Sequence, residues 1–558
     1  MPLEIPGSMG RSYLTKSGKR PKFVEEGTTL IDTSQKAARK FVYVDGEWKL
    51  VRGALGCYSA IAKKQETDVW AEDCYGKTID EGEAGVDDTE VIKSALDVGG
   101  KIKLGEGTFK ITQTLKPQSN TELLGFGIGK TILKKYADIN LIEVGGRGEN
   151  YVENIRIANL ELDGNLSEYP AGTGLKIGYS RRITVENLYI HDNYFLQLAC
   201  LNTPPEKSEE YLPTDITINN LYVNAYTTRE YTEGILIGGR YVNASNIIIW
   251  NANKGQALHV YDSVFDRSHD INLSNIVIYN SVKGIGVTAP YAVNITNATL
   301  YNIEQWGLRI MPNKEASDYQ GGLKPVHGVV VDNITIRNAC TAVVAGTAAI
   351  VIRNAQRVKI RGRIHTCQLP GVRIDTEDVW GYTPDFDTQD IDLDLQIRNC
   401  GLQGAIEATK AGITLSMAHR DIVNVLIRGQ ILNNQKYSVA LSRQVDTLYA
   451  RKIKIEAIMD QGIYNEDYMV DRYENSGTAT ITGDGTTTTF TVDITHGLVK
   501  DTVVAKITLD RDGSVDKVYL VDTNSDGFKE TLRVQVTFAS APANGEEVPI
   551  YWEARVVS

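Results

Sequence analysis

The sequence contains few cysteines and no long apolar run, and each shortage excludes a class of protein. Six cysteines in 558 residues are too few for a disulfide scaffold, and no two of them form the Cys-x-x-Cys pair of a zinc or redox site. No apolar stretch reaches the roughly 18 residues that a membrane-spanning helix needs. Residues 1–20 also lack the continuous apolar segment of a secretion signal. We therefore expect a soluble chain that does not insert into a membrane.

Basic residues are outnumbered by acidic ones. The chain has 59 Lys and Arg against 70 Asp and Glu, a formal net charge of −11, which would repel a phosphate backbone. Nucleic acid is therefore not an expected partner. The sequence has no phosphate-binding or nucleophile motif, and we expect no cofactor and no metal. The hydrophobic share of 42% is close to that of an ordinary globular chain, so a large core can form.

A short repeat organises the middle of the chain. The pattern Asn, apolar, any residue, apolar begins at Asn159, Asn187, Asn220, Asn246, Asn275, Asn297 and Asn333. Between these copies lies a second pattern, Gly or Ala, apolar, any residue, apolar, whose closest copies are 22 or 23 residues apart, as from 349 to 371 and from 234 to 257. Such short strands without intervening helices are typical of a solenoid in which each coil pairs with its neighbours. The sequence predicts a parallel β-helix, with stacked Asn amides hydrogen-bonded from coil to coil.

Both ends of the predicted β-helix have segments that could cover them. Residues 86–98 have apolar residues at helical spacing behind two cap candidates, Asp87 and Asp88, and predict a short amphipathic helix. After residue 474 Thr alternates with apolar residues between turns, which is typical of an antiparallel β-sandwich. Three cysteines that follow the last strands of their coils predict a buried stack without disulfides. These are Cys340, Cys367 and Cys400.

Alternation along the strands predicts a row of outward side chains. The first and third residues after the Gly or Ala point inward, so the second and fourth face solvent. The row includes His259, Tyr261, Arg309, Arg353 and Arg373. Guanidinium groups match carboxylates and aromatic rings accept sugar rings, so this row predicts binding of an acidic glycan. The alternative is an ordinary surface ion pair between Arg353 and Asp375.

Two insertions, 312–327 and 376–388, follow the first strand at the same corner and carry acids and aromatics. Glycoside hydrolysis needs two carboxyl groups about 5 to 9.5 Å apart, and coils lie about 4.8 Å apart. Glu315 and Asp375, two coils apart, fit the spacing of an inverting pair of carboxyl groups. Asp378 or Glu377, in the second insertion, could substitute in this pair. Any of these acids could instead be a solvated turn residue. The candidate catalytic residues are Asp375, Glu315, Asp378 and Glu377, and the candidate sugar contacts in the second insertion are Trp380 and Tyr382.

Residues 75–115, with Asp87-Asp88-Thr89 and the turn Gly105 to Phe109, and the glycines from 125 to 129 resemble the opening segment of pectate-lyase-like right-handed β-helices. Phage tailspikes and capsule depolymerases are the members that the segment resembles most. The tail, residues 490–554, is similar to a C-terminal module of such spikes, which implies a homotrimer. For residues 1–74 the family implies attachment to other virion tail proteins.

The resemblance to a second family stops short of its catalytic residues. GLRIMP at 307–312 is similar to a strand of polygalacturonases, but Gly255 and Gln256 stand where that family has paired Asp. We therefore do not transfer that catalytic set. A lyase remains open, because β-elimination from a uronic acid needs a base and a carboxylate neutraliser, which His259 or Tyr261 with Arg309 could supply.

The sequence thus predicts an all-β chain with three parts: an adaptor or virion-attachment segment at 1–74, a right-handed parallel β-helix at 75–474 that carries the glycan site, and a C-terminal β-sandwich at 475–558. The resemblance implies a phage tailspike-like depolymerase, located in the virion tail and acting outside the cell, that hydrolyses bacterial surface polysaccharide. The alternatives are a polysaccharide lyase and a non-catalytic glycan-binding adhesin.

Overall fold

The computed structural model describes residues 58–556, and before residue 58 only the backbone of five short strands. Gaps in the described range are 147–150, 202–210, 231, 264–266, 289, 314–315, 317–321, 380, 446, 466–468, 471–473, 496–502, 510–511 and 522–530. The five strands form a sheet in the order β1 (Leu3–Glu4), β2 (Ser12–Thr15), β3 (Thr29–Asp32), β4 (Arg39–Val44) and β5 (Glu47–Val51).

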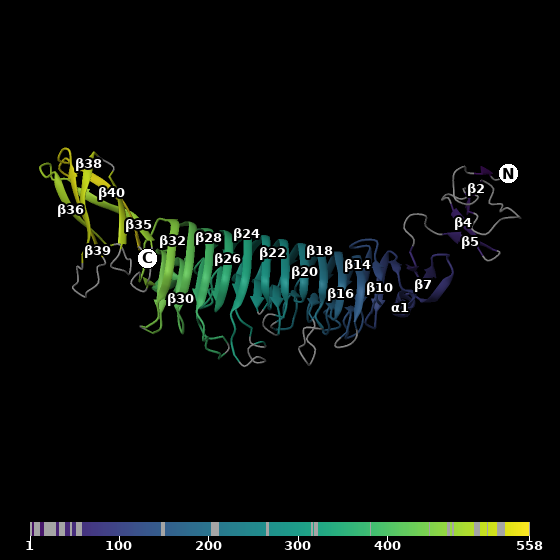
Figure 1. The fold of residues 1–558 in the computed structure, drawn as a ribbon. Helices are drawn as coiled ribbons and strands as arrows, with labels where there is room; N and C mark the ends of the chain where they lie inside the picture. The colour runs from purple at the N-terminus through teal and green to yellow at the C-terminus, as the bar shows by residue number, and fades with distance from the viewer. Residues whose placement is uncertain are drawn as a thin grey trace. The chain divides into compact units, whose positions relative to one another are not determined.

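The chain divides into two compact units, residues 1–259 with 269–277, and residues 260–268 with 278–558. In both units the strands stack as parallel coils (Figure 1). This arrangement confirms the expected parallel β-helix. No helix in the described part of the chain is long and apolar enough to cross a membrane.

After the five-stranded sheet, the first unit continues with three antiparallel strands and one helix. β6 pairs in parallel with β9, so pairing with the first coil starts before residue 74, the expected domain boundary. The boundary itself stays a prediction. The bounds are β6 (Ala60–Gln65), β7 (Asp68–Asp73), β8 (Thr78–Glu83), α1 (Asp88–Val98), β9 (Lys101–Leu104), β10 (Gly107–Ile111), β11 (Glu122–Leu124) and β12 (Thr131–Lys135).

The coils of the first unit alternate short and long strands. Short strands pair in parallel with short ones, and long strands with long ones, in unbroken register. The short strands are β13 (Ile142–Val144), β15 (Leu175–Ile177), β17 (Leu198–Cys200) and β19 (Ile235–Ile237), and the long ones are β14 (Val152–Asp163), β16 (Ser180–His191), β18 (Thr214–Asn224) and β20 (Arg240–Trp250).

The second unit follows a similar plan, except that the last residues of its first long strand pair with a short strand and its last short strand pairs with a long one. Its long strands are β23 (Tyr291–Ile310), β24 (Val326–Ala339), β26 (Ala355–Cys367), β28 (Thr388–Arg398), β30 (Ile422–Leu432) and β32 (Ala450–Met459). Its short strands are β25 (Ile350–Arg353), β27 (Val372–Asp375), β29 (Ala411–Met417), β31 (Tyr437–Arg443), β33 (Ile463–Tyr464) and β34 (Met469–Val470). The chain passes between the units within β21 (Gln256–Tyr261) and β22 (His269–Thr288).

The core of each coil is a column of apolar side chains. Leu160, Leu188, Leu221 and Ile247 occupy equivalent register positions on four successive coils, and all four are fully buried. Each coil has little core of its own, because its apolar side chains are covered chiefly by the coils before and after it. The core of the second unit also contains Cys340, Cys367 and Cys400, which are buried and free, as expected.

The repeating asparagines form the corners between strands. Asn159, Asn187 and Asn220 all have left-handed backbone, with φ of 59°, 50° and 54°, a conformation that Asn tolerates better than most residues. The Asn187 amide donates to Asn159 at 2.6 Å, and the Asn220 amide donates to Asn187 at 3.1 Å. In the second unit Asn333 donates to Asn297 and Asn338 donates to Asn302, both at 2.8 Å. The expected ladder of amides is confirmed.

A further left-handed corner near the start of the long strands has varied residue types: some coils carry Asn or Asp there, as at Asn154 and Asp215, and others do not. Arg182, Tyr241 and Lys452 have φ of 55°, 54° and 53° at the second or third residue of their long strands. Their side chains share no chemistry, so the residue pattern could not reveal this corner. The coil geometry, which bends the chain there in every turn, imposes the conformation.

The segments at the two ends of the β-helix have the kinds of secondary structure that the sequence predicts. α1 forms where an amphipathic helix was expected, but Asp87 does not cap its first turn through the side chain. Asp87 and Asp88 instead accept the backbone N–H groups of Glu83 and Gly85 in the preceding turn.

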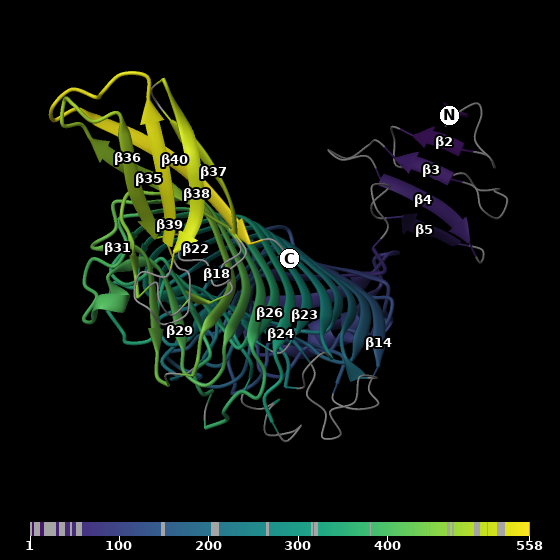
Figure 2. The same cartoon turned by 60° about the vertical axis from the view of Figure 1, so that its left-hand side comes forward.

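At the C-terminal end two antiparallel sheets of three strands enclose a core that includes Val534, Ile550 and Trp552 (Figure 2). The strands are β35 (Glu474–Thr482), β36 (Thr489–Thr495), β37 (Val503–Leu509), β38 (Gly513–Val521), β39 (Thr531–Phe538) and β40 (Glu547–Val556).

The amide ladder predicts a specific ranking of two variants. Asn187→Ala should lose two hydrogen bonds of roughly 1 kcal/mol each and strain the left-handed backbone by about 1 kcal/mol more. Asn187→Gly loses the bonds but keeps the conformation, so it should cost less than Ala. Urea unfolding followed by circular dichroism measures both. Equal losses for Ala and Gly would show that the backbone conformation contributes nothing.

Candidate functional site

The outward row of the second unit is covered by other parts of the chain. In β15 and β19 of the first unit the outward residue is half-exposed, as the strand alternation requires. In β27 all four residues are buried, and in β25 three of four are. The short strands there are therefore covered on their outer face too, so their polar side chains need partners within the protein.

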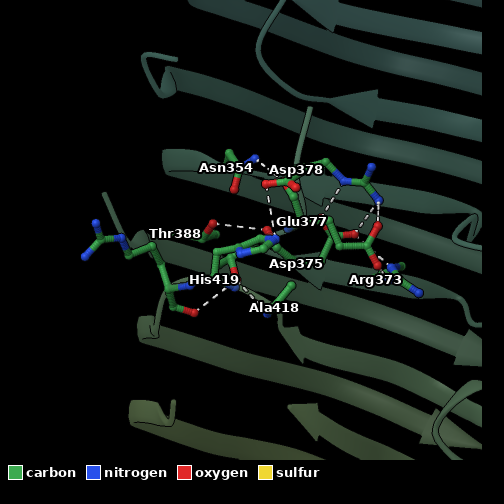
Figure 3. Close-up of polar contacts among 11 residues, drawn as sticks. Asn354, Arg373, Asp375, Glu377, Asp378, Thr388, Ala418 and His419 are labelled. Carbon is green, nitrogen blue, oxygen red and sulfur yellow. Dashed lines mark hydrogen bonds and ion pairs between the residues drawn. The ribbon is translucent and has the colours of Figure 1, made fainter. Parts of the chain in front are cut away.

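Asp375 lies at the centre of this covered region (Figure 3). It is the last residue of β27, pairs in register with Arg353 on the preceding coil, and has no exposed surface. The Arg353 guanidinium donates to both carboxylate oxygens, at 2.5 and 2.9 Å, and Arg373 Nε donates at 2.8 Å. The predicted Arg row therefore includes two guanidinium groups already held by an internal acid.

The protonation of Asp375 follows from this arrangement. Burial by itself raises the pKa of a carboxyl group, but the charges and hydrogen bonds of Arg353 and Arg373 outweigh burial and lower the pKa of Asp375. A carboxylate held in this way stays ionised and anchored. It can orient the two guanidinium groups, but it does not readily donate a proton to a ligand.

The accessible acids of the site lie two and three residues after Asp375. Glu377 accepts hydrogen bonds from Arg353 at 2.6 Å and from Arg373, and 29% of its side chain is exposed. Asp378 is 46% exposed and lies 3.1 Å from Nε2 of His419, which is 31% exposed. An acid held by two guanidinium groups thus sits next to an acid–imidazole pair, and both can be reached by a ligand.

Hydrogen bonds from buried polar groups fix the backbone of these residues (Figure 3). The hydroxyl of Thr376 accepts the N–H groups of residues 418–420 at 3.0 to 3.3 Å and so holds the turn that carries His419. The amide of Asn354 donates to the carbonyl of Glu377 at 2.7 Å. The site is therefore preorganised by groups that the ligand does not need to touch.

An apolar cluster joins the two insertions that the sequence singled out. Val379 is buried against Met311, which directly precedes the earlier insertion, and against Leu323 within it, with Tyr382 and Phe386 packed beside them. This contact places the 376–388 insertion over the strands. Tyr382 is thus half-buried and packs partly against protein.

Other predicted site residues have internal partners as well. His259 is almost fully buried, with Nδ1 3.3 Å from a carboxylate oxygen of Glu233. The Arg309 guanidinium lies 4.3 Å from the ring centroid of buried Trp306. Tyr261 is half-buried. Glu315 and Trp380 lie outside the described residues, and their roles stay predictions.

The structure brings together Arg353, Arg373, Asp375, Glu377 and Asp378 from the predicted set. His419 was missed by sequence reasoning, although a signal was present. Asp375 pairs in register with Ser416 on β29, so the residues that follow Ser416 reach the same corner one coil later. A lone His in a turn does not stand out until that register is known.

One group of side chains in the first unit has the composition of a cation site. Ligand atoms of Asp163, His191 and Asp192 lie within 4.8 Å of one another. Lys134 already pairs with Asp163 at 2.9 Å, and His191 contacts Asp192 and Glu161. Burial lowers the pKa of His191, but its bonds to the two carboxylates outweigh burial and raise the pKa to about 9. Internal cations therefore balance these acids at neutral pH.

Comparison with known proteins places the chain among parallel β-helices. No family model matches it. Over 126 residues it is 31% identical to the preneck appendage protein of Bacillus phage PZA. The matched segment covers 20% of this chain and 14% of that protein.

Solved structures give the same fold class. The pre-mature gene product 12 of bacteriophage phi29 superposes with a TM-score of 0.50 at 14% identity, over 67% of this chain and 50% of that one. A tailspike protein of E. coli bacteriophage HK620, in complex with a hexasaccharide, gives 0.49 at 12% identity, over 87% and 92%. The chain spans only half of the phi29 chain it matches. The likeness to phage appendage proteins, which the sequence suggested, is thus confirmed as a shared fold.

The buried ion pairs predict how stability depends on acid. Because the pKa of Asp375 is lowered in the folded state, its stabilisation is present above about pH 4, the ordinary value for Asp, and is lost as the pH falls through the folded value. Asp375→Asn leaves two guanidinium groups without this partner and should cost about 3–5 kcal/mol. Thermal melts between pH 2.5 and 7 should show a smaller fall of the melting temperature with acid for the variant than for the native chain. The same dependence of melting temperature on pH in both would contradict the assignment.

His191 predicts the opposite dependence. Its pKa is raised to about 9 from 6.5, so its stabilisation is complete below about pH 6.5 and is lost as the pH rises through 9. The loss is at most about 3 kcal/mol. Urea midpoints between pH 6 and 10 should fall for the native chain and stay flatter for His191→Gln. His365→Gln, at an exposed position, is the matched control and should leave the native profile unchanged.

Proposed function

We propose that the chain is a phage tailspike-like depolymerase that binds and hydrolyses a bacterial surface glycan. The observation that carries the proposal is the pair of accessible acids, Glu377 and Asp378, set on a fixed insertion over the covered strands of a parallel β-helix. Hydrolysis of a glycosidic bond uses two such carboxyl groups, one to protonate the leaving oxygen and one as base or nucleophile. The phage appendage fold is consistent with this role.

The contacts suggest different roles for the acids. Asp378, which is accessible and lies next to His419, is the proposed general acid. Glu377, held by two guanidinium groups, is the proposed base or nucleophile. Asp375 is the proposed positioning residue, because it touches both guanidinium groups and no solvent. Glu315 stays a proposed partner from the earlier insertion.

A lyase is the alternative for the same site. β-Elimination requires a cation that neutralises the uronate carboxylate together with a base. His419 could serve as the base, but Arg353 and Arg373 already bind two internal carboxylates. This favours hydrolysis over elimination at the Asp375 cluster. The wider assignment, to a homotrimer in the virion tail that attaches through residues 1–74 to other tail proteins, rests on the fold likeness.

Cleavage assays on purified bacterial capsular polysaccharide test the proposal. New reducing ends without absorbance near 235 nm, where the unsaturated product absorbs, are expected for a hydrolase. Absorbance would identify a lyase, and binding without cleavage would identify an adhesin.

Variants at the accessible acids locate the activity. Glu377→Gln and Asp378→Asn should each lower kcat by at least about 100-fold while the far-UV spectrum is unchanged. Asp385→Asn is the matched control, because this exposed acid lies in the same insertion. Full activity in both variants would move the site elsewhere.

A further inference from the structure

A second column of outward side chains runs along another face of the second unit. On β23, β24, β26 and β28 the residues Tyr301, Arg337, His365 and Arg398 occupy equivalent register positions. The strands β23, β24 and β26 lie side by side in Figure 2. Arg363 stands beside the column, two residues before His365. With coils about 4.8 Å apart, the four residues span about 14 Å. We call these five residues the basic face.

The cations of the basic face have no acidic partner. Arg337, Arg363 and His365 are exposed, and none of them makes an ion pair or hydrogen bond with another described residue. Arg398 donates to Gln430 at 3.0 Å, while its Nε is buried without a partner. The two residues in register with Arg363, Thr335 and Gln396, are neutral.

The same strands neutralise their cations on the adjoining face. Before the corner, Lys359 and Arg428 both pair with Asp392, at 3.6 and 2.6 Å. Arg337 and Arg398 lie on either side of His365 in the column, so two permanent cations stand two coils apart with no carboxylate between them in the column. In a chain with a net charge of −11, this local excess of cations suits an anion from outside.

Aromatic side chains extend the basic face at one end. The rings of Tyr279 and Tyr301 stack with centroids 5.1 Å apart and planes within 4°. Both side chains are half-exposed. Tyr301 is in register with Arg337, so a ligand could contact a ring and a guanidinium group together. Guanidinium groups bind carboxylates through two parallel hydrogen bonds, and aromatic rings pack against apolar faces of sugars.

We propose that the basic face is a second glycan-binding surface, separate from the Asp375 cluster, that holds an acidic polysaccharide through its carboxylates. The proposal rests on the proposed function for the nature of the ligand. It moves the acidic glycan expected from the Arg309–Arg373 row to a different face. Retention of a long polymer here would keep chain segments near the cleavage site while successive bonds are cut.

Polymer binding by the full chain tests the proposal. The probes are polygalacturonate, which carries carboxylates, and neutral dextran, with isothermal titration calorimetry at two salt concentrations. We expect binding of polygalacturonate only, weaker at high salt. The variant Arg337→Gln/Arg363→Gln/His365→Gln should weaken it at least tenfold. Lys77→Gln/Lys116→Gln removes the same number of permanent cations, two, from exposed positions elsewhere and should bind as the native chain does.

Several results would overturn the proposal. Unchanged affinity in the basic-face variant, or equal binding of dextran, would show that this face does not select an anionic glycan. A lower molar mass for the basic-face variant than for the native chain, measured by light scattering, would identify the face as an interface between copies of the chain.

The Glu377→Gln variant separates this surface from the catalytic proposal. It should keep native affinity for polygalacturonate. If no glycan is cleaved by the native chain but the basic face still binds polygalacturonate, the proposed hydrolysis fails and the binding surface stands.

Discussion

Register between successive coils is the constraint on which the rest of the structure depends. A single coil has too little apolar surface to form a core, so Leu160, Leu188, Leu221 and Ile247 are buried only because they align across four coils. The same alignment brings Asn amides at the corners within hydrogen-bonding distance and allows left-handed backbone to recur in every turn. A shift of one residue in any strand would turn its apolar side chains outward. The register therefore fixes both the core and the positions available for function.

Function is placed where the regular coils are interrupted. Insertions leave the corner after the short strands, and in the second unit the outward faces of β25 and β27 are buried instead of solvent-facing. Burial requires each charge to have a partner, and Asp375 between Arg353 and Arg373 meets that requirement. The anchored pairs then hold Glu377 in place, while Asp378 and His419 remain accessible. On the basic face no insertion covers the strands, so Arg337 and Arg363 stay exposed.

Much of the fold could be predicted, because its signals are local and repeated. The Asn pattern, the spacing of 22 or 23 residues and the amphipathic segment at 86–98 each reflect a single physical requirement. The corner at Arg182, Tyr241 and Lys452 could not be predicted, because the coil imposes its conformation whatever the side chain. For the site, alternation correctly brought Arg353, Arg373 and Asp375 together. It could not show that the two guanidinium groups bind internal acids, or that His419 reaches Asp378, since both depend on the paths of long insertions.

The sequence by itself determined the parallel β-helix, its amide ladder and the side chains that alternate outward, because strand pleating and coil stacking translate residue order directly into position. Only the tertiary structure decided which of those outward charges are available to a ligand. Availability depends on what covers a side chain and on which charge lies within a few ångströms of it, and these neighbours come from residues far apart in the chain. For that reason the Arg353 and Arg373 pair, prominent in the sequence, is internally neutralised, whereas the less conspicuous Arg337, Arg363 and His365 present an open basic face.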